Sequence, residues 1–232
     1  MRIALFGGSF DPPHSGHIGI AMAAVERLHL DRVLMAPVGR QPLKRDQAQS
    51  SFEDRMVMVQ LACAGHPQLA ASAIDAPRPD GRYNYTYDTL QLLRETLPGG
   101  DELFCLVGAD SLQTLHHWHR AAEALMVAQW IVAARPGFTL ETLETLLPAG
   151  IHPDEPDHGD GWLRIPLNAA PPVSSADNSQ QGTLWLLPGL HYEVSATELR
   201  AALAGDSTAI QQRVLNPRVA EYAREHELYR RT

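Results

Sequence analysis

The chain has 232 residues, of which 44% are hydrophobic, 20% charged and 6% aromatic. This composition is that of a globular protein and excludes a disordered or fibrous chain. The formal net charge is -8, which disfavours nonspecific nucleic-acid binding because that binding needs a basic surface. No apolar run approaches the roughly 18 residues of a membrane span, and the apolar start before Asp11 is too short for a signal peptide.

We therefore expect a cytoplasmic protein that binds neither nucleic acid nor a membrane. The two cysteines, Cys63 and Cys105, lie far apart in apolar runs. This spacing predicts neither a disulfide nor a zinc site and fits a reducing compartment. Lys44 is the single lysine among 19 basic residues, the others being arginine.

Strands and helices alternate in the hydrophobic pattern of the first part of the chain. The expected strands are Arg2–Phe6, Arg32–Ala36, Leu69–Ile74, Leu103–Val107 and Val127–Ala133. The expected helices are Gly16–Leu28, Phe52–Ala64 behind a capping box at Ser50 and Glu53, Tyr87–Glu95 and Leu112–Leu125. Such alternation predicts a Rossmann-like α/β fold, in which a parallel sheet is covered by helices on both faces.

The composition changes between Pro148 and Gly182, where Pro, Gly, Ser, Asp and Asn dominate. Only Trp162–Leu167 is typical of a strand there, so we expect a loop-rich insertion over about 148–182, with its acidic stretch 154–160 as a solvated loop. The regular elements expected after it are the strand Thr183–Leu187, the helix Ser195–Leu203 and a final helical segment, Pro217–Glu225. We expect a single domain over 1–232 with a helical C-terminal segment.

The strongest motif is GGSFDPPHSGH, from Gly7 to His17, which ends the first strand and opens the first helix. Ligands of parallel sheets bind beyond the carboxyl ends of the strands, and a helix N-terminus there attracts phosphate. Gly7 and Gly8 allow close backbone approach, while His14 and His17 lie on one side of the helix and can donate hydrogen bonds to phosphoryl oxygens.

Two other interpretations of this motif remain open from the residues alone. One is a Gly-Pro turn that carries two surface histidines, and the other is a metal site built on His-x-x-His, although no third ligand follows with helical spacing. The motif is neither the dinucleotide fingerprint nor a P-loop.

The same segment resembles the nucleotidyltransferase signature G-x-F-x-P-x-H-x-G-H, and VSATELR, Val194 to Arg200, resembles the C-terminal I-S-S-T-x-x-R motif of that superfamily. Three intervening blocks resemble those of the bacterial nicotinate-nucleotide adenylyltransferase family: YNYTYDTL, LVGADSLQTLHHW and IVAARPG. The resemblance covers nearly the whole chain apart from 148–182. Two motifs in the expected order at opposite ends are far more specific than either alone.

The resemblance implies transfer of AMP from ATP to nicotinate mononucleotide, a step of NAD biosynthesis that yields nicotinate adenine dinucleotide and pyrophosphate. The acceptor phosphate is already a nucleophile, so the reaction needs positioning and charge stabilisation rather than a catalytic base. The implied cofactor is Mg²⁺, which bridges phosphate oxygens with no ligand from a protein side chain.

The resemblance also assigns roles to individual residues. His14 and His17 bind the triphosphate, with His17 on the α-phosphoryl group in the transition state. Lys44 and Arg200 hold the departing pyrophosphate, a role for which the mobile lysine ammonium is suited. The other residues implied in ATP binding are Gly7, Gly8, Ser9, Phe10, Gly108, Asp110, Ser195 and Thr197.

Some of these residues have a second interpretation. Asp110 follows a predicted strand and can accept hydrogen bonds from ribose hydroxyls, or it can cap the helix that it precedes. Ser195 can close a capping box with Glu198, and Thr197 can simply fill the first turn.

The nicotinate end of the site is implied by Thr86, Trp118, His119 and Arg135. Trp118 stacks on the pyridine ring, backbone N–H groups near Thr86 and His119 receive the carboxylate, and Arg135 approaches the mononucleotide phosphate. Taken by itself, Trp118 is more typical of a core or surface aromatic.

Three positions depart from the family pattern: Leu43 replaces a histidine, Ala196 a serine and His119 an aromatic residue. The first two reduce the phosphate contacts, and the third changes the geometry of pyridine recognition. Two alternative functions stay open. One is adenylyl transfer to nicotinamide mononucleotide or phosphopantetheine, and the other is a noncatalytic nucleotide-binding regulator. The oligomeric state is not determined by the sequence.

Overall fold

The computed structural model describes residues 1–42, 50–134, 136–170, 182–190, 196–205 and 214–229. The predictions made for Leu43, Lys44, Arg135 and Ser195 lie outside these residues. None of the described helices combines the length and the hydrophobicity needed to cross a bilayer.

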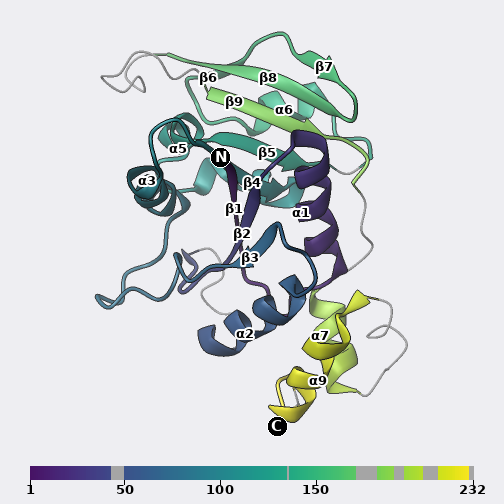
Figure 1. Ribbon diagram of the computed structural model, residues 1–232. Helices are drawn as coiled ribbons and strands as arrows, with labels where there is room; N and C mark the ends of the chain where they lie inside the picture. The colour runs from purple at the N-terminus through teal and green to yellow at the C-terminus, as the bar shows by residue number, and fades with distance from the viewer. Residues whose placement is uncertain (43–49, 135, 171–181, 191–195, 206–213, 230–232) are drawn as a thin grey trace. The chain divides into compact units, whose positions relative to one another are not determined.

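Within the described residues, nine strands form one sheet in the order β3-β2-β1-β4-β5-β9-β8-β6, with β7 paired to β8 (Figure 1). The strands are β1 Arg2–Gly8, β2 Arg32–Pro37, β3 Leu69–Ala71, β4 Glu102–Gly108, β5 Gln129–Ala133, β6 Ile151–Pro153, β7 Asp157–Gly159, β8 Trp162–Ala169 and β9 Gly182–Leu187. The central pairs β1–β4, β4–β5 and β5–β9 are parallel. The predicted Rossmann-like α/β fold is confirmed.

The central strands are apolar along almost their whole length. In β4 the five residues from Leu103 to Val107 are all buried, as are Ile3 to Phe6 of β1. Parallel strands covered on both faces need such continuous apolar runs, because neither side of the strand meets water. The helices are α1 Ser15–Leu28, α2 Phe52–Cys63, α3 Thr86–Thr96, α4 Ala109–Leu112, α5 Ala121–Val127, α6 Leu140–Leu146, α7 Ala196–Ala204 and α9 Pro217–Glu225.

The prediction of a loop-rich insertion over 148–182 is wrong for its described part. Strands β6, β7 and β8 lie there, and β8 pairs antiparallel with β9, β6 and β7. The acidic stretch 154–160, predicted as a solvated loop, contains β7. A two-residue Asp160-Gly161 link joins β7 to β8, with Gly161 at φ 77°, and this Asp-Gly pair was the available hairpin signal.

The predicted helix Leu112–Leu125 is also wrong, because the segment is broken into α4, a short 3₁₀ helix at Leu115–His117 and α5. The break has a backbone cause: Arg120, which caps α5, is left-handed with φ 53° and ψ 46°. A left-handed residue cannot continue a right-handed helix. Helix α6, capped by Thr139, was not predicted.

The N-cap of α2 is Ser51 rather than the predicted Ser50. Its hydroxyl accepts a hydrogen bond from the backbone N–H of Asp54 at 3.0 Å and donates to the Asp54 carboxylate at 2.6 Å. Asp54 therefore takes the place predicted for Glu53 in the capping box. Ser50 has a different role at the site described below.

The chain divides into two compact units, each assembled from three segments. The first unit is Met1–Phe6, Ala23–Val33 and Tyr85–His191, and the second is Gly7–Met22, Leu34–Asn84 and Tyr192–Thr232. The single domain expected over 1–232 stays a prediction. In the first unit α3 and α5 contact each other, and α5 also contacts β5 and β9.

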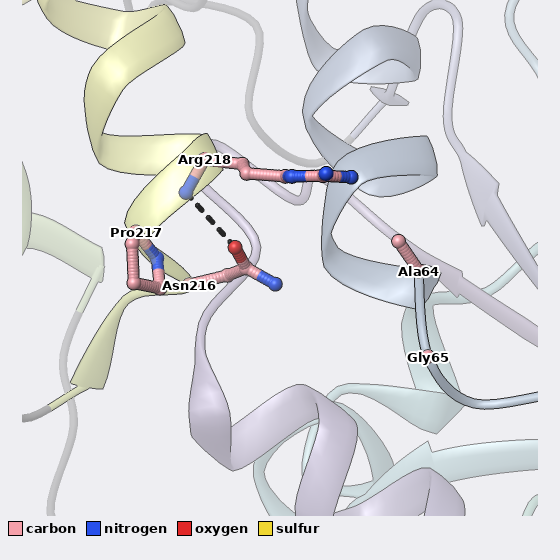
Figure 2. A pocket seen from close by; sticks show the side chains of 5 residues that line it. All are labelled: Ala64, Gly65, Asn216, Pro217 and Arg218. Carbon is pink, nitrogen blue, oxygen red and sulfur yellow. Dashed lines mark hydrogen bonds between the residues drawn. The ribbon is translucent and has the colours of Figure 1, made fainter.

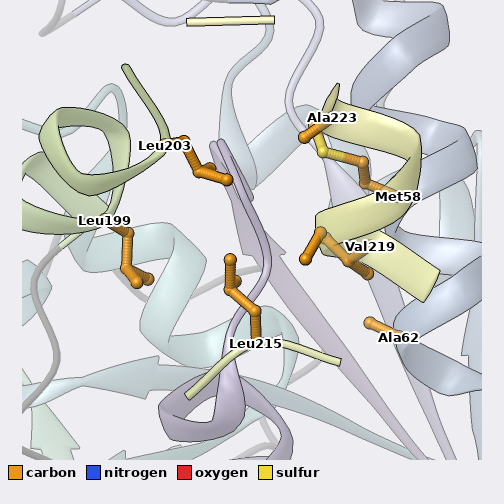
Figure 3. Packing of buried hydrophobic residues seen from close by; sticks show 8 residues of the cluster. Met58, Ala62, Leu199, Leu203, Leu215, Val219 and Ala223 are labelled. Atoms are coloured by element: carbon orange, nitrogen blue, oxygen red, sulfur yellow. The ribbon is translucent and has the colours of Figure 1, made fainter. Parts of the chain in front are cut away.

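The C-terminal helices of the second unit share one apolar cluster with α2 (Figure 3). It consists of the buried residues Met58, Ala62, Leu199, Leu203, Leu215, Val219, Ala220 and Ala223. Burying apolar side chains contributes roughly 25 cal/mol per Å² of area removed from water. This cluster is therefore what holds α7 and α9 on α2 within the unit.

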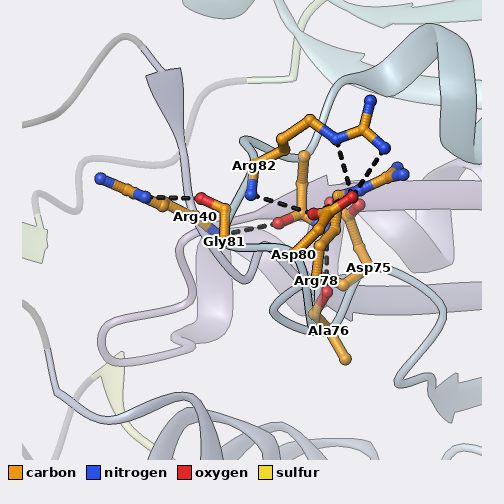
Figure 4. Close-up of polar contacts among 8 residues, drawn as sticks. Arg40, Asp75, Ala76, Arg78, Asp80, Gly81 and Arg82 are labelled. Carbon is orange, nitrogen blue, oxygen red and sulfur yellow. Dashed lines mark hydrogen bonds and ion pairs between the residues drawn. The ribbon is translucent and has the colours of Figure 1, made fainter.

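The segment before α3 is held by polar contacts (Figure 4). Asn84 donates to the carbonyls of Asp75 and Ala76 and accepts from the backbone N–H of Arg40 at 3.0 Å. Beside it, Gly39 runs so close to Pro77 that a Cβ there would lie 2.3 Å from the Pro77 nitrogen. Only glycine fits at this position.

Candidate active site

The predicted phosphate loop lies in the second unit, between the end of β1 at Gly8 and the start of α1 at Ser15. Gly7 is exposed, and a Cβ added there would meet no described atom within 4 Å. Packing against the described residues therefore does not require glycine at this position. A Cβ at Gly8 would lie 3.2 Å from the ring of Phe10, which is buried and left-handed with φ 48°.

His14 and His17 stand together at the start of α1, with ring centroids 3.8 Å apart. The backbone N–H of His14 donates to Nδ1 of His17 at 3.2 Å. Because Nδ1 of His17 is the acceptor, the proton of the neutral ring is on Nε2, the atom that can donate to a ligand oxygen. The ring of Phe10 meets that of His17 edge-on at 5.0 Å.

His14 is buried rather than a surface residue. Burial lowers its pKa to about 4, because desolvation penalises the charged imidazolium. Its Nδ1 atom is buried and finds no hydrogen-bond partner among the described residues. At neutral pH the free protein therefore presents His14 as an uncharged imidazole.

Arg200 of α7 joins the two ends of the chain. One guanidinium nitrogen donates to the backbone carbonyl of Asp11 at 2.8 Å, and the other donates to the Thr197 hydroxyl at 3.2 Å. The N-terminal loop and the C-terminal motif are thus in contact through two residues that are 189 positions apart in sequence. Ala196 begins α7.

Asp11 is a residue of this site that the sequence analysis missed. Its side chain is only 3% exposed. One carboxylate oxygen accepts from the Ser50 N–H at 3.2 Å, and the other accepts from the Tyr229 hydroxyl at 2.6 Å. The available signal was its place in the Gly7–His17 motif, because a carboxylate beside a predicted phosphate site needs protein partners that satisfy its charge.

Arg55 of α2 was missed as well, although it is only 2% exposed. Its guanidinium donates to three backbone carbonyls, those of Ser9 at 3.0 Å, Val38 at 2.9 Å and Ser50 at 3.2 Å. Burial lowers its pKa, and the charge of Asp11 acts in the opposite direction. The available signal was an arginine on the apolar face of a helix, one turn before Met58.

Two predicted adenosine-binding residues belong to the first unit. Gly108 is the N-cap of α4, and a Cβ added there would meet no described atom within 4 Å. Asp110 is exposed in the first turn of α4 instead of preceding it, so the interpretation of Asp110 as a helix cap is wrong.

The predicted nicotinate residues with described positions also lie in the first unit. Thr86 is the first residue of α3, and the side chain of its N-cap, Tyr85, makes no capping hydrogen bond. The ring of Tyr85 lies 4.4 Å from that of His119, so the histidine that departs from the family pattern keeps a stacking contact. The Arg120 guanidinium lies over the Tyr87 ring at 4.0 Å.

The contacts of His119 with Tyr85 and of Arg120 with Tyr87 link these two residues to the start of α3. Trp118 is half-buried, and its ring lies 5.8 Å from that of the buried Trp130. The indole N–H of Trp118 donates to the Thr114 hydroxyl at 3.2 Å, which fixes the plane of the ring.

Two hollows lie in the second unit. An open one of about 430 Å³ is lined by Ala64, Gly65, Asn216, Pro217 and Arg218, none of them a predicted site residue (Figure 2). A second, of about 190 Å³, is lined by Pro13, His14, Ser15, Ile18, Ala62, His66, Val214, Leu215 and Asn216. Of the predicted residues, only His14 borders the second.

The protein side chains offer little to a metal ion. Across the part of the chain that the structure describes, no group of three or more His, Cys, Asp or Glu residues is placed to hold one. Both carboxylate oxygens of Asp11 already accept hydrogen bonds from Ser50 and Tyr229. Within the described residues, Asp11 is therefore not free to hold a cation directly.

Comparison with known proteins gives a consistent result. Residues 5–201 match the model of the family described as cytidylyltransferase-like. A protein of Neisseria meningitidis serogroup B (strain ATCC BAA-335 / MC58), named "probable nicotinate-nucleotide adenylyltransferase", is 35% identical over 228 residues, 98% of each chain. A protein of Solibacter usitatus (strain Ellin6076) with the same name is 31% identical over 229 residues, 99% of this chain and 100% of the other.

Among solved structures, Plasmodium falciparum nicotinic acid mononucleotide adenylyltransferase complexed with NaAD resembles this chain with a TM-score of 0.68. The match covers 98% of this chain and 97% of the other at 15% sequence identity. At that identity the likeness shows the fold.

The three hydrogen bonds of Arg55 predict a large loss of stability in Arg55→Met. The substitution leaves three carbonyl oxygens without their donor and removes one of the cations near the buried Asp11. We expect the free energy of unfolding in urea to fall by about 3 kcal/mol or more. Arg82→Met, which removes an exposed arginine that pairs with Asp80, is the control and should cost less than about 0.5 kcal/mol. A loss below about 1 kcal/mol in Arg55→Met would contradict this role.

The lowered pKa of His14 predicts a stability that depends on pH. The unfolded chain takes up a proton at the ordinary pKa of 6.5, whereas the folded protein does so only near 4. The stabilisation is therefore complete above pH 6.5 and is lost as the pH falls toward 4, by at most about 3 kcal/mol. Urea titrations across this range should show a flatter pH dependence in His14→Gln. An unchanged pH dependence in this variant would mean that His14 is not held neutral.

Proposed function

The chain belongs to the cytidylyltransferase-like family, and within it to the nicotinate-nucleotide adenylyltransferases, and on this premise we propose that it transfers AMP from ATP to nicotinate mononucleotide. The products are nicotinate adenine dinucleotide and pyrophosphate, which places the reaction in NAD biosynthesis. The names of these two relatives support this choice of acceptor.

The observation that carries the proposal is the contact of Arg200 with the carbonyl of Asp11. This contact holds a cationic side chain of the C-terminal motif against the loop that carries His14 and leads to His17 in α1. A guanidinium and two imidazoles in one compact unit suit a polyphosphate, which is a dense array of hydrogen-bond acceptors.

The reaction needs no base from the protein. A phosphate oxygen of the acceptor attacks the α-phosphorus of ATP, the bond from this phosphorus to the β-bridging oxygen breaks, and pyrophosphate leaves with the electron pair. His17 donates its Nε2 proton in a hydrogen bond to a non-bridging α-oxygen, where negative charge concentrates in the transition state. Arg200 and Lys44 hold the leaving pyrophosphate.

His14 acts in this step as a neutral hydrogen-bond donor. Because its ring is neutral in the free protein, it binds a phosphoryl oxygen as a hydrogen-bond donor and contributes no formal charge until ATP is present. Gly7, Gly8 and Ser9 supply the surface on which the phosphates lie, and the buried Phe10 supports this surface by packing against Gly8. Mg²⁺, coordinated by phosphate oxygens, would neutralise part of the charge of the leaving group.

The first unit supplies the residues that bind the two nucleosides. Asp110 accepts from ribose hydroxyls, and Gly108 leaves space for the adenosine. At the nicotinate end, Trp118 stacks on the pyridine ring, and the uncapped start of α3 at Thr86, next to His119, receives the carboxylate. Arg135 contacts the phosphate of the mononucleotide. Ser195 and Thr197, from the C-terminal motif, contribute to the contacts with ATP.

Two other functions remain as alternatives and are separated by the same experiment. The transferase chemistry is compatible with nicotinamide mononucleotide or phosphopantetheine as acceptor. A nucleotide-binding regulator would bind ATP without turnover.

We expect pyrophosphate release with ATP, Mg²⁺ and nicotinate mononucleotide, at a kcat/KM more than about tenfold above that for either other acceptor. The reason is that N–H donors aimed at a carboxylate are poorly matched by an amide. Pyrophosphate release is measured with each acceptor in turn, and the products are identified by mass. Activity only with phosphopantetheine or nicotinamide mononucleotide would overturn the acceptor, and ATP binding without turnover would favour the regulator.

The proposed role of His17 predicts that His17→Ala lowers kcat by more than about a hundredfold, with the affinity for ATP nearly unchanged. A contact that strengthens only in the transition state affects the rate and not the binding of the ground state. Steady-state kinetics and calorimetry with ATP measure the two effects separately. The exposed His152→Ala should turn over like the wild type, and near-normal turnover in His17→Ala would remove His17 from the mechanism.

A further inference from the structure

Tyr229, at the C-terminal end of the described chain, contacts the N-terminal phosphate loop. Its hydroxyl donates to a carboxylate oxygen of Asp11 at 2.6 Å, and the two residues are 218 positions apart in sequence. Asp11 lies between the glycines of the loop and His14, and its backbone carbonyl is held by Arg200. One residue of the loop is therefore fixed by the C-terminal segment at two of its groups.

The backbone conformation after α9 places the Tyr229 hydroxyl next to Asp11 of the phosphate loop. The N–H of Leu228 donates to the carbonyl of Ala223 at 2.9 Å, which closes the helix end. Glu227 and Tyr229 are both left-handed, with φ 53° and 71°. This conformation costs about 1 kcal/mol or more for a residue with a side chain and persists where the surroundings enforce it.

Those surroundings are apolar. Leu228 and Tyr229 pack against the cluster of α2, α7 and α9 residues shown in Figure 3. The Tyr229 hydroxyl also lies 3.8 Å from the sulfur of Met58. Packing thus fixes the ring, and the ring fixes the position of the hydroxyl.

The hydroxyl is a permanent donor in this site. Burial and the neighbouring charge of Asp11 raise the pKa of Tyr229 above its usual range, so the phenol keeps its proton at physiological pH. The second oxygen of Asp11 accepts from the N–H of Ser50, which precedes α2. Each oxygen of the Asp11 carboxylate is therefore hydrogen-bonded within the protein, and the charge of Arg55 acts on it.

We propose that Tyr229 is a positioning residue for the phosphate loop: by donating to Asp11 it holds the backbone between Gly8 and His14 in the shape that binds the triphosphate of ATP. This inference rests on the proposed function, which assigns the loop to ATP. Tyr229 itself touches no substrate. The expected effect of its loss on the loop runs through Asp11, the loop residue that its hydroxyl holds.

A second tyrosine provides a matched control. The hydroxyl of Tyr222 on α9 donates to a carboxylate oxygen of Asp54 at 2.9 Å. This bond has the same chemistry and lies in the same unit, but Asp54 belongs to the first turn of α2 and not to the phosphate loop. Removing either hydroxyl costs one tyrosine–aspartate hydrogen bond.

The test compares Tyr229→Phe and Tyr222→Phe by calorimetric titration with ATP, after thermal unfolding has shown both variants to be folded. We expect the Kd for ATP to rise at least about fivefold in Tyr229→Phe and to stay within about twofold in Tyr222→Phe. In turnover, kcat/KM for ATP should fall by about the factor by which the Kd rises, while the KM for the acceptor stays within about twofold. ATP affinity in Tyr229→Phe equal to that of the wild type, or an equal loss in both variants, would overturn the proposal.

A double variant tests whether Tyr229 acts through Asp11. In an Asp11→Ala background the hydroxyl has no carboxylate to hold, so adding Tyr229→Phe should weaken ATP binding by less than about twofold further. Losses that multiply would overturn the mechanism.

The affinity for ATP is measured without an acceptor, so it does not depend on the identity of the acceptor. A wild type that binds ATP but does not use nicotinate mononucleotide would refute the acceptor and leave the result for Tyr229 interpretable. A wild type that does not bind ATP would overturn both.

Discussion

The site depends on one buried cation. The guanidinium of Arg55 donates to the carbonyls of Ser9, Val38 and Ser50, which lie in the loop after β1, at the end of β2 and before α2. Buried carbonyl oxygens need donors, and a buried guanidinium needs acceptors and a nearby negative charge, so each group satisfies the other. Three segments that are far apart in the sequence are thereby fixed within one compact unit, and the loop carrying His14 and His17 starts from this fixed point.

The sequence was informative where a local rule decides the structure. Continuous apolar runs predicted the central strands, and the Gly-rich motif at the end of β1 predicted the turn from β1 into α1, because both follow from neighbouring residues. The hydrogen bond from Tyr229 to Asp11 could not be predicted, since no periodicity connects residues 218 positions apart. The break between α4 and α5 was missed because it rests on a left-handed Arg120, a residue type that rarely adopts this conformation.

Each unit carries groups suited to one part of the chemistry. The second unit gathers cationic and hydrogen-bonding side chains around a glycine-rich loop, and its carboxylate, Asp11, is occupied by Tyr229 and Ser50 and therefore does not compete with a phosphate. The first unit offers flat rings and an uncapped helix start at Tyr85 and Thr86. For transfer between two phosphates, which is accelerated mainly by positioning and by charge stabilisation, the second unit offers charged and hydrogen-bonding groups and the first unit offers ring surfaces.

The central claim is that an oxygen of the acceptor phosphate forms the new bond to the α-phosphorus of ATP. The most direct measurement uses nicotinate mononucleotide whose phosphate oxygens are labelled with ¹⁸O, and it follows the label by mass in both products. If the acceptor phosphate forms this bond, all of the label is found in the dinucleotide and none in the pyrophosphate. Labelled pyrophosphate, or unlabelled dinucleotide, would contradict it.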